Sequence, residues 1–171
     1  MKKFIFLSLM MLVSMGIKAQ SVVGAWAATQ EEDGMNMAII LGLDKANNSI
    51  VKLLVEVKEE EVGTINVEAT CEGTYTFDGS TLKLQIDENN TTVGLGDIEW
   101  SESMKQAFAA KPELETTIRS SIEGAMQEQM GSMKAGIKEL SQLTVVSISE
   151  NSMDLKAMGD DEIITFNKVQ P

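Results

Sequence analysis

Histidine is absent from this chain of 171 residues. Its absence removes the commonest general base, metal ligand and pH switch near neutrality, so no Ser-His-Asp or Cys-His catalytic arrangement can form. A phosphate-binding glycine loop is also missing, since Gly94-Leu95-Gly96 indicates only a turn. We therefore expect a protein that is not an enzyme and that holds no cofactor and no metal.

Cysteine and basic residues are also scarce. Cys71 is the only cysteine, which excludes an internal disulfide, and its place on an apolar strand face predicts a buried free thiol. Lys and Arg number 14 against 26 Asp and Glu, and the formal net charge is −12. A chain this acidic repels nucleic acid and anionic membrane surfaces, so we expect neither as a partner.

The N-terminus has the pattern of a secretory signal peptide. Lys2 and Lys3 precede an apolar run over 4–17, and Ala19 offers a small residue for cleavage. We predict a signal peptide at 1–19, one domain at 20–171, a periplasmic or secreted location, and no integral membrane segment after cleavage. A retained N-terminal anchor helix is the alternative, although the apolar run is short for a membrane span.

Short strands are predicted wherever apolar residues recur at every second position. The clearest run covers 65–77, where Gly73 is a natural place for a bend. In chain order, the eight predicted strands are 21–29, 35–43, 51–57, 65–77, 82–86, 146–148, 153–157 and 164–166. Such a series favours an eight-stranded antiparallel up-and-down barrel. A two-sheet sandwich of the same strands is the alternative.

Residues 97–140 interrupt this series with a helical pattern, which predicts two helices inserted between strands 5 and 6. Asp97 is the expected N-cap of the first helix, and Pro112 opens the second. Gly124, Gly131 and Gly136 weaken the second helix, and they let it bend or let another backbone approach. Its apolar stripe comprises Leu114, Ile118, Ile122, Met126, Met130, Met133, Ile137 and Leu140. The fold class is therefore mainly β with a helical insert (α+β).

The triplet Gly24-Ala25-Trp26 on the first strand resembles the G-x-W of the lipocalin-like, or calycin, superfamily. The hairpin over 73–79 is similar to that of lipocalin-like domain proteins exported by Gram-negative bacteria. The resemblance implies an eight-stranded barrel, closed at one end by the tryptophan, with a small apolar cavity inside. Lipocalins also pack an arginine from late in the barrel on this tryptophan, and the last strand here offers Lys168.

Two non-enzymatic functions follow as hypotheses, ahead of a third, an enzyme that uses carboxylates alone. The first is a non-enzymatic binding protein that holds a small apolar ligand, with the helical insert as a lid or wall. The second is an interaction or structural module, in which the helical stripe docks a protein partner or a second copy and the barrel is inert. The ligand-binding residues expected under the first are Trp26, Met37, Leu53, Val55, Val67, Tyr75, Phe77, Met126, Met130 and Met133.

Two metal hypotheses have simpler alternatives. Methionine sulfur on the second helix suits Cu(I), but methionine is also a flexible filler of apolar cores. The acidic runs 59–61 and 160–162 suit calcium, but acidic loops between strands are usually just solvated. We favour packing for the methionines and solvation for the acidic runs.

Overall fold

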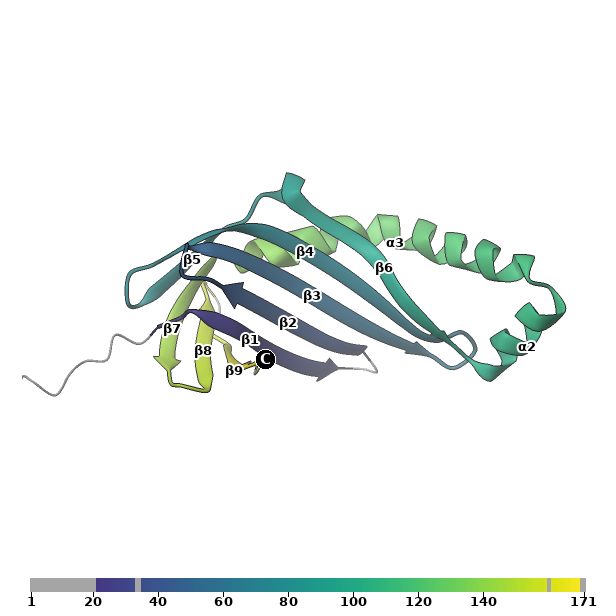
Figure 1. Ribbon diagram of the computed structural model, residues 1–171, viewed down its shortest axis with the longest axis horizontal. Helices are drawn as coiled ribbons and strands as arrows, with labels where there is room; N and C mark the ends of the chain where they lie inside the picture. Colours follow the sequence, from purple (N-terminus) through teal and green to yellow (C-terminus); the bar gives the residue numbers. More distant parts are fainter. Residues whose placement is uncertain (1–20, 33–34, 160, 170–171) are drawn as a thin grey trace, which may run out of the picture.

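The computed structural model describes residues 21–32, 35–159 and 161–169 (Figure 1). The predicted signal peptide at 1–19 lies outside these residues. The strands are β1 (Gly24–Glu32), β2 (Met35–Leu43), β3 (Asn48–Glu59), β4 (Gly63–Phe77), β5 (Thr81–Gln85), β6 (Thr91–Trp100), β7 (Gln142–Ile148), β8 (Ser152–Ala157) and β9 (Ile163–Lys168). The helices are a short 3₁₀ helix η1 (Glu88–Asn90), α2 (Glu102–Ala110) and α3 (Glu113–Glu139). No helix in the described ranges is both long and apolar enough to cross a membrane.

Eight of the strands close into an antiparallel barrel. Their order around the ring is β1-β2-β3-β4-β5-β7-β8-β9, and β9 pairs with β1 to complete it. Because this order follows the chain, the ring is an up-and-down barrel, and the sandwich alternative is wrong. At the other end of the molecule β1, β2, β3, β4 and β6 continue past the ring as an open sheet (Figure 1).

The strand β6 was not predicted, and the placement of the helical insert was wrong for that reason. The helices follow β6 rather than separating strands 5 and 6. Gly94, Gly96 and a β-bulge interrupt the alternation of apolar and polar residues along β6. Across the bulge, Leu95 pairs with Val67 and Ile98 with Ile65, so two residues three apart share a face.

The first helix accordingly begins later than Asp97, which lies within β6. Ser101 is its N-cap, and the Ser101 hydroxyl accepts a hydrogen bond from the Met104 backbone N–H at 3.3 Å. Pro112 immediately precedes α3, as predicted. A second bulge, in β7, turns Val146 outward, where it is 51% exposed, instead of into the barrel.

The long strand β4 changes partner along its length. Gly63–Cys71 pairs with β6, and Thr74–Phe77 pairs with β5. Gly73 lies at the change, where a Cβ atom would collide with the backbone oxygen of Gln85. Only glycine fits this close approach, so the position predicted for a bend is where the open sheet meets the closed ring.

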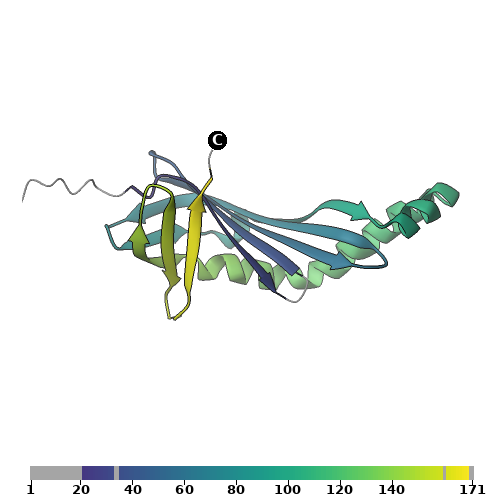
Figure 2. The same ribbon diagram turned by 90° about the horizontal axis from the view of Figure 1, so that it is seen from below.

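The core fills the closed end of the barrel. Trp26, Leu82, Met153 and Phe166 are almost completely buried there, and Ile137 from the end of α3 joins them. From this anchor α3 runs back along the inner face of the open sheet, as the two views show together (Figures 1 and 2). It packs mainly on β6, with further contacts to β3 and β4.

Candidate functional site

Trp26 seals the closed end rather than lining a cavity. Its indole N–H donates a hydrogen bond to the Val22 carbonyl at 2.8 Å, and the side chain is fully buried. The Lys168 ammonium lies 5.2 Å from the centre of the Trp26 ring, a cation–π distance. The lysine of the last strand thus takes the position on Trp26 for which the resemblance to lipocalins implies an arginine.

Two other residues expected in the binding site also belong to this packed end. Tyr75 is buried, and its hydroxyl donates to the Asp44 carbonyl at 2.8 Å. Burial, and secondarily the nearby Asp44 carboxylate, raises the pKa of the Tyr75 hydroxyl above its usual value. Phe77 is half-buried against the same core. Cys71 is buried on the inner face as a free thiol, as predicted.

The barrel wall splits between β1 and β9. The described pairing joins Trp26 and Ala27 of β1 with Lys168 and Asn167 of β9. Beyond that point β1 continues to Glu32 beside β2, while the start of β9 stays with β8. The two strands therefore diverge, and the inner face of the barrel opens to the outside between them.

A cavity of about 300 Å³ occupies this split. Its inner part is apolar and comes from four strands, and its outer part carries hydroxyl, amide and carboxylate groups. The lining residues are Ala28, Thr29, Gln30, Met37, Ile39, Leu53, Glu162, Ile163, Ile164 and Thr165. Met37, Ile39 and Leu53 are only half-buried, although they lie on the same inner face as the core. At this cavity the fold leaves apolar side chains partly uncovered.

The apolar stripe of α3 faces the protein itself. Leu114, Ile118, Ile122 and Met126 are half-buried, whereas most of the residues between them are exposed. Met133 and Leu140 pack on the core beside Ile137. The side chain of Met130 lies outside the described part of the structure. The helix α3 thus covers β6, β4 and β3.

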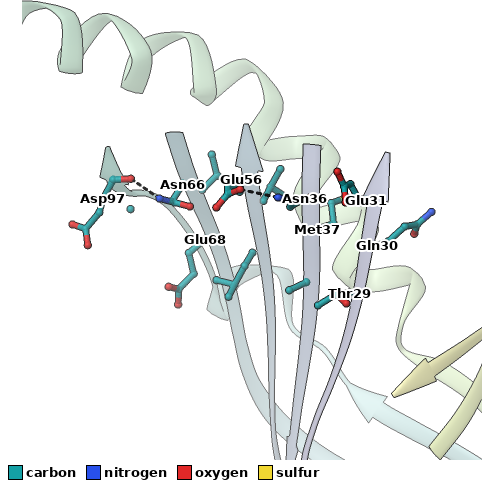
Figure 3. A pocket seen from close by; sticks show the side chains of 14 residues that line it. Thr29, Gln30, Glu31, Asn36, Met37, Glu56, Asn66, Glu68 and Asp97 are labelled. Carbon is teal, nitrogen blue, oxygen red and sulfur yellow. Dashed lines mark hydrogen bonds between the residues drawn. The ribbon is translucent and has the colours of Figure 1, made fainter. Parts of the chain in front are cut away.

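A larger and more polar hollow of about 840 Å³ lies over the open sheet (Figure 3). One row of side chains crosses its floor from β1 to β4, because Glu31, Asn36, Glu56 and Asn66 are successive cross-strand partners. Asn36 donates to the Glu56 carboxylate at 2.7 Å, and Asn66 donates to the Asp97 carbonyl at 3.0 Å. Of the expected binding residues, Met37, Val55 and Val67 also line this hollow.

Two glutamates of this hollow, Glu56 and Glu68, have lowered pKa values. The hydrogen bond from Asn36, followed by that from Lys58, lowers the pKa of Glu56. Lys52, which lies 2.8 Å from the Glu68 carboxylate, and then Thr70 lower the pKa of Glu68. A general acid near neutral pH needs a raised pKa, so neither glutamate suits that role. The described residues contain no group of three or more acids or Cys placed to hold a metal ion.

No protein-family model and no curated protein matches this chain. Of the expected binding residues, Met37 and Leu53 line the cavity in the split, and Val55 and Val67 continue the same inner face beyond it. The lining residues Ala28, Ile39 and Ile164 were not among those expected. Their positions on the inward faces of the strands could have indicated them. No sequence pattern indicates the place where the barrel wall opens.

Proposed function

We propose that this protein is a non-enzymatic binding protein that holds a small apolar ligand in the cavity between β1 and β9. One observation carries the proposal: apolar side chains of the inner face remain partly exposed beside an opening in the barrel wall. In a filled barrel these side chains would be buried by one another. Pockets for small ligands start at about 300 Å³, and they combine an apolar lining with a few polar groups.

The closed end supports a lipocalin-like version of this function. Trp26 and Lys168 plug one end of the barrel, which confines a ligand to the other end. The predicted signal peptide is consistent with a carrier acting in the periplasm or outside the cell. The alternative is a partner docked on the helical stripe. The position of the stripe does not support it, because the stripe packs on the protein's own sheet.

Two adjacent isoleucines give a matched test. Ile39 lines the cavity, whereas Ile40 is half-buried on the opposite face of the same strand and pairs with Lys52. Ile39→Trp should fill the cavity and weaken binding of the fluorescent probe N-phenyl-1-naphthylamine by about tenfold, or about 1.4 kcal/mol. Ile40→Trp should leave the affinity within about twofold, well under 1 kcal/mol.

Circular dichroism and urea unfolding would establish that both variants are folded. The proposal is wrong if the unmodified protein does not bind the probe, or if folded Ile39→Trp binds it as tightly as the unmodified protein. Native mass spectrometry of the protein purified from its host would then look for a small molecule retained from the cell.

A further inference from the structure

The shape of the cavity limits the size of the ligand. Its volume of about 300 Å³ equals that of about ten water molecules at ~30 Å³ each. A methylene group is similar in size, so the cavity has room for one aliphatic chain of about ten carbons. The entrance is a split between two strands, which admits a single chain more readily than a two-chain lipid.

The polarity of the lining changes along the cavity. Met37, Ile39 and Leu53 form the inner part, whereas Thr29 and Thr165 lie where β1 and β9 diverge. Thr29, Gln30 and Thr165 are exposed there, and the apolar residue Ile163 beside them is also exposed. A ligand that matches this gradient has an apolar tail inside and a polar head group at the opening.

The charge at the opening is negative. Glu162 is the charged residue among those lining the cavity. Asp161 precedes it in the turn before β9, and Glu31 follows Gln30 on β1. Lys156 pairs with Asp161 at 2.8 Å. Lys168 lies at the far end of β9, over Trp26.

We infer that the cavity takes a single-chain cationic amphiphile, with an aliphatic tail of about ten carbons among the inner residues and an ammonium head group at Glu162. This inference rests on the proposed function and specifies its ligand class. Charge complementarity carries it: an ammonium gains attraction from the carboxylates at the opening, whereas a carboxylate head group meets repulsion there.

Three probes of equal chain length test the head group: decyltrimethylammonium, decanol and decanoate. Displacement of N-phenyl-1-naphthylamine from the protein by each compound is measured in 50 mM salt. The two ionic amphiphiles are kept below their critical micelle concentrations, and decanol is kept below its solubility limit. The cation should bind about three- to fivefold more tightly than the alcohol, and decanoate should bind most weakly, because partly exposed charges contribute modestly. Raising the salt to 0.5 M should reduce the difference.

Two charge variants locate the effect. Glu162→Gln should reduce the preference for the cation over decanol by about threefold, with the affinity for decanol unchanged. Glu150→Gln removes the same charge from the turn between β7 and β8, at the opposite end of β8, and should change nothing.

The outcomes separate the inference from the proposed function. If decanol displaces the probe but all three head groups bind equally, or if decanoate binds best, the head-group inference is overturned and the binding cavity stands. An unchanged cation preference in Glu162→Gln likewise overturns it. If neither the naphthylamine probe nor any of the three amphiphiles binds, the proposed function itself is overturned.

Discussion

Lys168 and Trp26 form the contact at which the barrel ring closes. The ammonium lies 5.2 Å from the ring centre, and the two residues are register partners of β9 and β1. Lys168→Met keeps an aliphatic chain over the indole but removes the charge, so we expect a loss of about 0.5–1 kcal/mol in the free energy of unfolding. Urea denaturation measures this loss.

Lys83→Met is the matched control for that substitution, because Lys83 is an exposed lysine of β5 and is not a neighbour of the tryptophan. Equal stability of Lys168→Met and the unmodified protein would show that the ammonium contributes nothing at this contact. Trp26→Ala should cost about 3–5 kcal/mol, since it empties the largest fully buried side chain of the core.

Asp154 connects three strands through one carboxylate. It accepts hydrogen bonds from Ser147 of β7 at 2.7 Å and from Thr165 of β9 at 2.8 Å. These bonds, that from Ser147 first, lower the pKa of Asp154 below its usual value of about 4. The resulting stabilisation is complete above about pH 4 and is lost as the pH falls through the lowered pKa of the folded state.

We therefore expect Asp154→Asn to be less stable than the unmodified protein at pH 7 and to approach it in stability as the pH falls below about 4. Thermal unfolding followed by circular dichroism across this pH range measures the difference. Asp97→Asn, at an exposed position of β6, is the control for loss of one acid. A stability difference that stays constant with pH would contradict the assignment.

At the scale of elements, α3 is anchored at one end. Ile137 is fully buried in the barrel core, whereas Ile122, four turns earlier on the same stripe, is half-buried. Ile137→Ala should cost about 2–5 kcal/mol in the free energy of unfolding. Ile122→Ala removes the same atoms from the half-covered part of the helix and should cost clearly less. Equal losses in urea denaturation would contradict this difference.

The glycines of α3 offer a stabilising change. At Gly124 and Gly131 an added Cβ would meet no atom within 4 Å, and both positions are exposed. The structure therefore shows no close backbone approach that would require glycine at these positions. Gly124→Ala and Gly131→Ala should each stabilise the protein by about 0.5–1 kcal/mol, because alanine favours the helix. A decrease in the thermal midpoint would show that α3 depends on glycine here.

For the whole molecule, the sequence predicts the ring better than the opening. Inward alternation along β2, β3 and β4 is regular, so the barrel and its apolar face could be predicted. β6 could not, since Gly94, Gly96 and the bulge at Leu95 break its period. The cavity depends on β1 extending beyond its pairing with β9. How far two strands stay paired depends on residues that are distant in sequence, so no local sequence pattern predicts it.

The join between β1 and β9 also has a kinetic consequence. It pairs strands from the two ends of the described chain, so the ring cannot close until nearly the whole polypeptide is free to fold. Contacts this distant in sequence cost loop-closure entropy before they stabilise anything, and folding slows accordingly. Until β9 pairs with β1, the free edge of β1 exposes unpaired backbone groups. Chaperones shield such edges in newly made chains. Closure of the barrel is therefore expected late in folding, after any translocation is complete.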